Sequence, residues 1–380
     1  MRFPFGEGTR KMNSQGKKLI GTAQAVCLFI LVRCFSLFSF SFVSPELANS
    51  SARLVAILIG TALGFLFFIP TYLLFRKYDR GILGVARKFG RVAEIITGLL
   101  VYGLCFFSFV ILLAQFNYFL ETTIYKSGSK IIYMFILSLA SFYGMKKGIE
   151  PCARAEFIFF VIIMGASLLG AIFLIPDIEL VNLSSPFFYS KREILRLGYL
   201  FAVQNLPLIL LLVFRDNIKG KGERVYLYYS LGAFLVFEIV FFLVITILGE
   251  FAYSKSFAIF SLAGVSKGGT LKRYDSFYMF AWIFTALVKS TMLLFALREA
   301  LGSLSCSHLR GKWLDLALGA TIALALGFGG SLSKSSRLFE RAIGFNSVGA
   351  LFLAVGVVLP MILAIKNPKE KRNKRIERKV

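Results

Sequence analysis

The sequence predicts an all-α polytopic membrane protein with about ten transmembrane helices. Of its 380 residues, 57% are hydrophobic and 16% are aromatic, and the mean hydropathy is +0.74. Apolar runs long enough to cross a bilayer recur throughout the sequence, which excludes an ordinary soluble domain. We therefore divide the chain into a basic tail (residues 1–18), a transmembrane domain (residues 19–365) and a second basic tail (residues 366–380).

The uneven distribution of positive charge predicts the orientation in the membrane. The net charge is +24, from 44 Lys and Arg against 20 Asp and Glu. When spans are drawn over the apolar runs, most of the basic residues fall on the side that holds both tails. The positive-inside rule then places both termini in the cytoplasm. We expect the C-terminal tail to contact anionic membrane lipid, and we expect no nucleic-acid partner.

Side chains suited to enzyme chemistry are scarce. The single histidine is His308, and the sequence has neither clustered carboxylates nor a glycine-rich phosphate loop. We therefore expect a binding protein or a carrier, with no catalytic residues, no cofactor and no metal. The five cysteines contain no C-x-x-C pair, and we interpret them as buried apolar side chains: Cys27, Cys34, Cys105, Cys152 and Cys306.

The first span, residues 19–43, carries Gln24 near its start and Arg33 near its centre. A central arginine costs about 2.5 to 3.5 kcal/mol on insertion scales, so its guanidinium must face protein, water or a counter-charge. Because Arg33 is too far from either end to reach a headgroup, we predict a ligand-binding or ion-paired role for it. Cys34 and Phe35 beside it are candidate ligand contacts, although such side chains commonly serve packing alone.

Spans two to five contain few polar residues. The glycines Gly60 and Gly64 have the small-residue spacing that allows close helix contact. Tyr102 in the third span is a candidate ligand contact, with plain packing as the alternative. A basic segment between spans two and three, residues 76–91, predicts a short amphipathic helix at the cytoplasmic surface. The predicted spans cover residues 53–75, 92–120 and 131–143, followed by a fifth that ends near residue 175.

The sixth span, residues 198–214 (GYLFAVQNLPLILLLVF), is interrupted in its middle by Gln204, Asn205 and Pro207. Proline removes one backbone donor, so nearby carbonyls need a partner outside their own helix, and lipid offers none. Such a break persists where it is packed in protein or lines a wet cavity. A plain proline kink is the alternative. The amide pair beside the proline favours a binding site, with Gln204 and Asn205 as ligand contacts.

Spans seven and eight each carry a charge near the middle, Glu238 and Lys289. Each charge alone would be costly in the bilayer, so we predict that Glu238 pairs with Lys289 or with Arg33, or that these residues serve coupling roles. Lys289 and Ser290 are also candidate ligand contacts, although a serine can bond to its own helix instead. The last four spans are predicted at residues 225–251, 274–301, 313–330 and 339–365.

The positions of the polar interruptions suggest two five-helix halves related by inverted topology. Arg33 interrupts the first span of one half, and the break at residues 204–207 interrupts the first span of the other. An inverted repeat would bring spans one and six together at the midplane of the membrane. No obvious sequence repeat accompanies this pattern.

A segment at residues 143–157, YGMKKGIEPCARAEF, resembles the "Tyr…Gly-Ile-Glu-x-x-Ala-Arg" stretch of the spore germinant receptor B subunits, the endospore germination permease family of the amino acid/polyamine/organocation transporter superfamily. Gln24, the segment NLSSPFF (182–188) with Arg192 and Ile194, and the segment LKRYDSFYMFAWI (271–283) extend the resemblance over about residues 24–360. The matching motif residues are Gly148, Ile149, Glu150, Arg154, Arg273 and Asp275.

The resemblance implies ten spans in the leucine-transporter fold and a role in sensing a small nutrient, often an amino acid, bound between spans one, three, six and eight. It also implies the inner membrane of bacterial spores as the location, and a larger A subunit and a lipoprotein C subunit as partners. A proton- or sodium-coupled amino acid transporter of the cell membrane is the alternative function. A third interpretation is a membrane assembly factor with a vestigial cavity.

The sequence departs from the family pattern at two places. The family commonly has a glycine in an unwound part of span one, whereas this chain has LVRCFSLF (31–38) with Arg33 and no glycine. Such a fixed cation could anchor a ligand carboxylate, replace a coupling ion or lock the helix by pairing with Glu238. Lys272 stands where the family often has glutamate. Ligand identity therefore does not transfer from the family to this chain.

Overall fold

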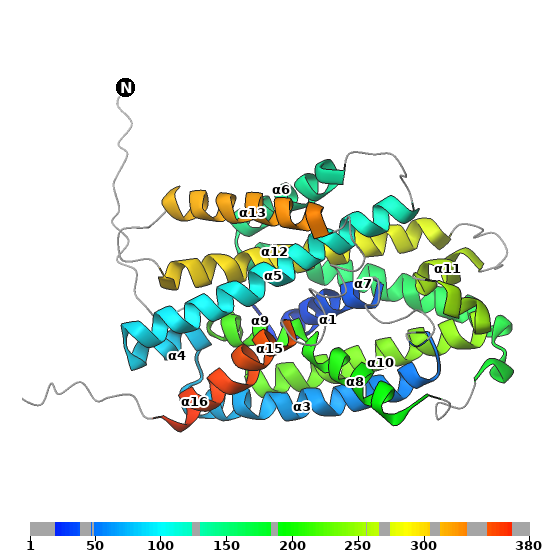
Figure 1. Ribbon diagram of the computed structural model, residues 1–380, viewed down its shortest axis with the longest axis horizontal. Helices are drawn as coiled ribbons and strands as arrows, with labels where there is room; N and C mark the ends of the chain where they lie inside the picture. The colour runs from blue at the N-terminus through cyan, green and yellow to red at the C-terminus, as the bar shows by residue number, and fades with distance from the viewer. Residues whose placement is uncertain are drawn as a thin grey trace, which may run out of the picture.

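The computed structural model describes residues 20–38, 47, 49–123, 130–183, 189–255, 257–265, 274–304, 312–332 and 348–366. Over these residues the chain is a helical bundle (Figure 1), in which eight segments are long and apolar enough to cross a membrane. Two further helices, α1 (Thr22–Phe38) and α6 (Lys130–Lys147), lie where the sequence predicts spans one and four. The eight are α3 (Ala52–Tyr78), α5 (Arg91–Thr123), α7 (Ile149–Leu174), α8 (Lys191–Val203) with α9 (Leu206–Phe214), α10 (Gly222–Leu248), α12 (Tyr274–Leu304), α13 (Lys312–Leu332), and α15 (Val348–Leu353) with α16 (Leu359–Ile365).

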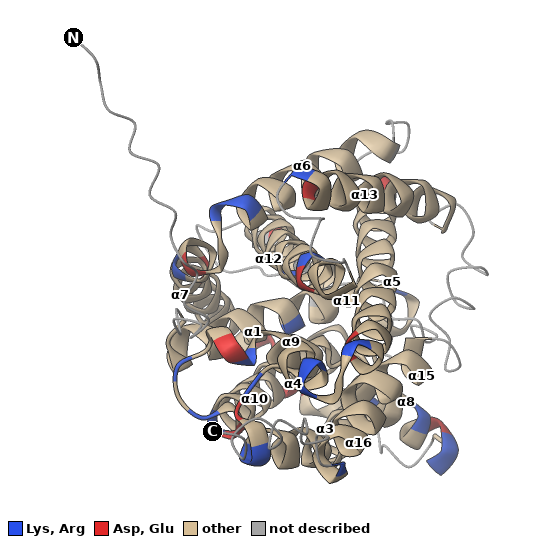
Figure 2. Cartoon of the chain, turned by 90° about the vertical axis from the view of Figure 1, so that its left-hand side faces the viewer, with Lys and Arg blue, Asp and Glu red and all other residues tan. Residues whose placement is uncertain are grey.

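Both predicted tails, apart from Lys366, lie outside the described residues, as do His308, Cys306 and Arg273. Where the basic residues are described, Figure 2 shows many of them at the end of the bundle that carries α4 (Ile82–Phe89). The predicted amphipathic helix at residues 76–91 corresponds to α4. Its apolar side chains Ile82, Val85 and Ala86 are fully buried against neighbouring helices of the bundle. This helix therefore packs on protein instead of resting on lipid.

The first spans of the two predicted halves run in opposite directions. Ile20, just before α1, forms an isolated parallel bridge with Ile218, just after α9. Its N–H donates to the carbonyl of Asn217 at 3.0 Å, and the N–H of Lys219 donates to the carbonyl of Ile20 at 2.8 Å. Span one therefore enters the bundle where span six leaves it. This antiparallel relation between the first spans of the two halves is what an inverted repeat requires.

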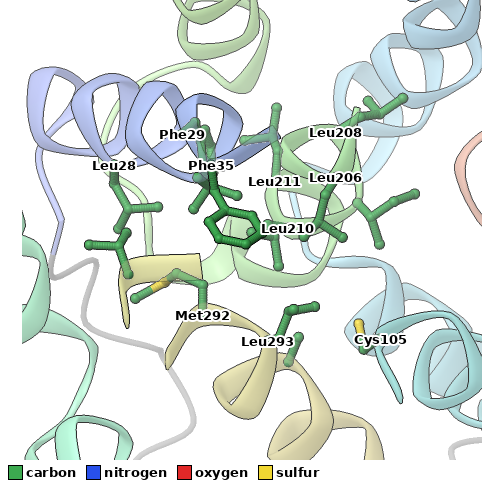
Figure 3. Packing of buried hydrophobic residues seen from close by; sticks show 14 of the residues in the cluster. Leu28, Phe29, Phe35, Cys105, Leu206, Leu208, Leu210, Leu211, Met292 and Leu293 are labelled. Carbon is green, nitrogen blue, oxygen red and sulfur yellow. The ribbon is translucent and has the colours of Figure 1, made fainter. Parts of the chain in front are cut away.

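The first and sixth spans form the interior of the bundle. Helix α1 packs against α7, α10 and α12, and every residue of α9 is buried. Figure 3 shows Phe29 and Phe35 of α1 facing the leucines of α9, with Met292 and Leu293 of α12 below them. A helix that is apolar on all sides is stable only when other helices surround it or lipid does. Here other helices surround it, so polar atoms on α1 and α9 must find partners within the protein.

Helices α3 and α8 approach closely through two glycines. A Cβ atom on Gly60 would lie 2.6 Å from the carbonyl oxygen of Gly198 and 2.7 Å from a ring carbon of Phe201. A Cβ atom on Gly198 would lie 2.9 Å from the side chain of Ile59. The predicted close helix contact at Gly60 is confirmed. Because the two backbones almost touch, the position of α8 is fixed by α3.

The sequence predicts interruptions in spans one and six, and over the described residues the structure shows the second but not the first. Helix α1 is a continuous α-helix through Arg33, so the described part of span one is not interrupted. The reason is local, since residues 22–38 contain neither glycine nor proline to break the helix. Span six is broken as predicted, between Val203 and Leu206. Span ten contains a π-helical segment, Ala354–Val358, directly before Pro360.

Candidate functional site

The break in span six leaves backbone carbonyls that need partners. Helix α8 ends at Val203, Gln204 and Asn205 leave the helical path, and α9 begins with Pro207 in its first turn. The last carbonyls of any helix have no donor within that helix, and here proline also removes a donor from the next turn. At membrane depth these oxygens cannot be left to lipid. Another side chain must reach them.

Arg33 of span one donates to two of these carbonyls, and one of them, that of Gln204, also accepts from the N–H of Leu206 at 2.9 Å. The Nη1 of Arg33 donates to the carbonyl oxygen of Gln204 at 2.5 Å, and its Nη2 donates to that of Phe201 at 2.6 Å. The guanidinium lies 4.3 Å from the ring centroid of Phe201 and 5.4 Å from that of Phe237, and Arg33 is only 2% exposed. A cation at the carbonyl end of a helix also complements the helix dipole. Arg33 therefore caps α8 and joins span one to the break.

On the same side of the break, Asn205 is held by two tyrosines. Its Nδ2 donates to the hydroxyl of Tyr226 at 3.1 Å, and its Oδ1 accepts from the hydroxyl of Tyr229 at 2.6 Å. The hydroxyl of Tyr226 in turn donates to the carbonyl of Gly64 at 2.8 Å. The side chain of Asn205 is thus occupied within the protein and ties α9 to α10 and α3. The structure gives it a positioning role.

We predict that Asn205→Leu destabilises the protein by about 2 kcal/mol, because it leaves the buried hydroxyl of Tyr229 without its acceptor and that of Tyr226 with only the carbonyl of Gly64. Thermal unfolding of the purified variant in detergent measures this change. Tyr229→Phe should cost less, since it removes its hydroxyl instead of leaving it without an acceptor. An Asn205→Leu variant as stable as the wild type would show that the network contributes nothing to holding the break.

On the other side of the break lies a cavity of about 80 Å³. Its lining comes from α1, α5, the α8–α9 break, α12 and α15. A single water needs on the order of 10 to 15 Å³, so the cavity has room for several waters or for a small solute. The apolar lining is Leu104, Ile111, Leu200, Val203, Leu206, Val348, Gly349 and Phe352, and the polar lining is Ser36, Ser108, Gln115, Gln204 and Lys289.

Lys289 is the one charged residue among those that line the cavity. Its ammonium donates to the hydroxyl of Ser36 at 3.3 Å and lies 4.9 Å from the ring centroid of Phe35. Among the described residues, neither Lys289 nor Arg33 forms an ion pair with Glu238, which is half-buried on α10 and does not line the cavity. The predicted pairing is therefore absent from this structure, because Arg33 and Lys289 already have other partners.

The side chains of Gln204 and Gln115 complete the polar lining. Within the described part of the chain, neither amide group makes a hydrogen bond to protein, although Gln115 is only 7% exposed. Neither amide is among the fully buried side-chain atoms that lack a partner, so both are open to the cavity, where water or a ligand can satisfy them. The cavity therefore offers two free amide groups to a polar molecule.

The other predicted contact residues lie outside this cavity. Cys34 is buried in the apolar core, and Phe35 packs against Trp282 with ring centroids 6.1 Å apart. The hydroxyl of Tyr102 shares a hydrogen bond of 2.9 Å with Thr321 on α13. Ser290 hydrogen-bonds to Ser141 on α6 and donates to the carbonyl of Leu287 at 3.0 Å. These contacts hold helices together, as the packing alternatives proposed.

Three cavity residues escaped prediction from the sequence: Ser36, Ser108 and Gln115. Ser108, Ile111 and Gln115 are spaced by three and four residues, so they share one face of α5. That spacing is visible in the sequence and could have indicated a polar face on this helix. The depth of Gln115 does not follow from the sequence, because the depth of a residue in a long helix depends on where the helix enters the membrane.

The motif residues shared with the germinant receptor B subunits have structural explanations. Gly148 has a φ angle of 103°, which favours glycine, and it precedes α7. Glu150 and Arg154 form an ion pair of 2.5 Å on the first turns of that helix. The carboxylate of Asp275 accepts from the N–H of Ser276 at 2.9 Å. None of these residues lines the cavity.

A second, larger space of about 350 Å³ lies between α7, α10, α11 (Ala258–Val265) and α12. Its lining is almost entirely apolar, with Ser167 and Tyr278 as its polar side chains. It offers few groups that could orient a polar ligand. The cavity at the break is therefore the better candidate for a binding site.

No family model matches the sequence, and no curated protein matches it. Among solved structures, the chain is similar to a Na⁺-coupled sialic acid symporter in a substrate-bound outward-open state. The TM-score is 0.61 at 13% identity, covering 93% of this chain and 92% of that chain. It is also similar to Mhp1, a nucleobase-cation-symport-1 family transporter in a closed conformation with bromovinylhydantoin bound. There the TM-score is 0.54 at 12% identity, covering 90% and 78%.

The chain has the leucine-transporter fold. At such low identity the similarity concerns the arrangement of the helices and carries no information about the substrate. It confirms the predicted polytopic all-helical class and the fold that the family resemblance implied. In the leucine-transporter fold, broken spans meet near the middle of the membrane, where solutes bind. The cavity beside Gln204 lies at such a break.

Proposed function

We propose that the chain is the solute-binding subunit of a membrane nutrient sensor and that it binds a small polar nutrient in the cavity beside the break. One observation carries this proposal. The break in span six opens onto a cavity that brings together the ammonium group of Lys289 and the side-chain amides of Gln115 and Gln204. The two amides make no hydrogen bond to protein among the described residues. A plain proline kink requires no such cavity.

Within this proposal the predicted contact residues divide into two groups. Lys289 and Gln204 contact the solute, and Ser36, Ser108 and Gln115 join them. Arg33 and Asn205 act behind the break by fixing its shape. Binding would then bias the receptor by favouring the conformation in which the cavity is closed around the solute.

The sensor role rests on the resemblance to the germinant receptor B subunits at residues 143–157. With this role we propose a receptor A subunit and a lipoprotein C subunit as partners, the spore inner membrane as the location, and cytoplasmic termini. The alternative is a proton- or sodium-coupled amino acid transporter, and the leucine-transporter fold favours a carrier equally. However, Glu238, which was expected to serve coupling, lies away from the cavity.

Reconstitution of the full chain into proteoliposomes separates the two functions. We expect saturable binding of a small organic acid or amino acid to the purified protein, without concentrative uptake of the radiolabelled solute. Robust concentrative uptake under a proton or sodium gradient would establish the carrier and overturn the sensor. If no small solute binds at all, the binding proposal itself fails. Co-purification of the A and C subunits with the tagged chain tests the partners.

A further inference from the structure

The carbonyl oxygens at the break are already occupied by a resident cation. Oxygens at the end of a broken helix are natural partners for a cation or for an ammonium group. In this chain the Arg33 guanidinium donates to the carbonyl oxygens of Gln204 and Phe201, at 2.5 Å and 2.6 Å. The charge of an arginine is permanent. An incoming cation or ammonium group therefore finds these acceptors taken.

The charge around the cavity is also unbalanced. Lys289 lines the cavity, and Arg33 is close enough to act on it electrostatically. Among the residues that line the cavity, none is acidic. Two cations close together in a low-dielectric interior without a counter-charge are costly. An anion bound between the helices would relieve that cost.

The donors in the cavity match such an anion. Lys289 has three N–H donors, and its one hydrogen bond to protein, to Ser36, is long at 3.3 Å. The amides of Gln115 and Gln204 can each donate to a carboxylate oxygen, and bonds to charged acceptors are the stronger kind. The apolar lining, including Leu104, Ile111 and Phe352, suits a short carbon chain.

We propose that the solute of this cavity is a small organic anion without an ammonium group, held through its carboxylate by Lys289, and that its binding requires no metal cation because Arg33 fills the cation position at the break. This inference rests on the proposed solute-binding function and narrows its substrate class. It departs from the amino acid that the family resemblance favours, and from sodium coupling.

Three probe molecules of similar size and different charge test the substrate class. Lactate is an anion, alanine is a zwitterion, and lactamide is neutral. Each is titrated against the purified full chain in detergent while the thermal unfolding midpoint is recorded. We expect lactate to raise the midpoint at a concentration at least tenfold lower than alanine or lactamide requires. Alanine that binds as tightly as lactate, or more tightly, would overturn the inference.

Variants of Lys289 test which group holds the carboxylate. Lys289→Met should weaken lactate binding at least tenfold, whereas Lys289→Arg, which keeps the charge, should retain most of it. Lys289→Met should still fold, because replacing a buried charge by an apolar side chain of similar size is commonly tolerated. Size-exclusion elution checks this. Ser138→Ala is the matched control, since Ser138 is buried on α6 and bonds only to its own helix.

Replacing sodium by choline at constant ionic strength tests whether solute binding requires a metal cation in addition to Arg33. We expect the lactate titration to change by less than twofold. A strict sodium requirement, or lactate binding by Lys289→Met equal to that of the wild type, contradicts the inference. If alanine or lactamide binds regardless of the residue at position 289, the inference fails while the proposed function stands. If none of the three probes binds, both fail.

Discussion

Replacing Arg33 with leucine is expected to abolish solute binding and to lower the free energy of unfolding by about 3 kcal/mol. The variant removes the side-chain donor from the carbonyl of Phe201 and leaves that of Gln204 with only the N–H of Leu206, and a buried polar group that loses its partner costs about 1 to 3 kcal/mol. Removing a buried charge offsets part of this cost. Membrane insertion should persist, because leucine is more apolar than arginine. Thermal unfolding and lactate titration of the purified variant measure the two effects.

Two further variants separate capping from charge. Arg33→Lys keeps the charge but loses the planar pair of donors, so it should reach one carbonyl and show an intermediate stability. Arg53→Leu removes another arginine, which packs 4.9 Å from the ring of Phe241 and does not touch the break. It should leave lactate binding unchanged. An Arg33→Leu variant that binds lactate as the wild type does would show that Arg33 has no part in shaping the site.

Replacing Gly60 with leucine is expected to have the largest effect on folding, a loss of about 3 kcal/mol or more. Even a Cβ atom at this position would lie 2.6 Å from the backbone carbonyl of Gly198, which cannot rotate away. The side chain would push α8 from α3 and move Phe201, whose carbonyl binds Arg33. The fraction of protein that remains monodisperse after heating in detergent reports the loss.

Gly165→Leu provides the matched control for that experiment. Gly165 lies on the exposed face of α7, and a Cβ atom there would meet nothing within 4 Å. The same change in size and hydrophobicity should therefore leave folding intact. If Gly60→Leu and Gly165→Leu are equally stable, close packing of α3 on α8 is not what holds the break in place.

The spans could be predicted from the sequence because each depends on local composition. Hydrocarbon accepts only long apolar helices, so apolar runs identify the spans without knowledge of their neighbours. The break in span six was equally local, since Pro207 lacks a donor wherever it is placed. The expectation of an interrupted span one was wrong for the described residues. A charged side chain such as Arg33 needs a partner but does not break its own helix.

The lining of the candidate cavity was predicted only in part. Gln204 and Lys289 were found because polar residues stand out in apolar spans, and both line the cavity. The pairing of Arg33 or Lys289 with Glu238 was wrong, because similar depth does not place side chains on facing sides of their helices. Ser36, Ser108 and Gln115 were missed. Small hydroxyls and a single amide carry too weak a signal until neighbouring helices show which face is enclosed.

The sequence alone determined that the chain crosses the membrane many times, that span six is broken or kinked at Pro207, and that Arg33 must have a polar partner. These follow from the cost of leaving backbone groups or charges in hydrocarbon, which each segment meets by itself. Only the tertiary structure decided which partner satisfies Arg33, because the carbonyls of Phe201 and Gln204 lie far from it in sequence. The contact arises from packing, as α3 positions α8 through Gly60 and the antiparallel halves bring α1 beside the break.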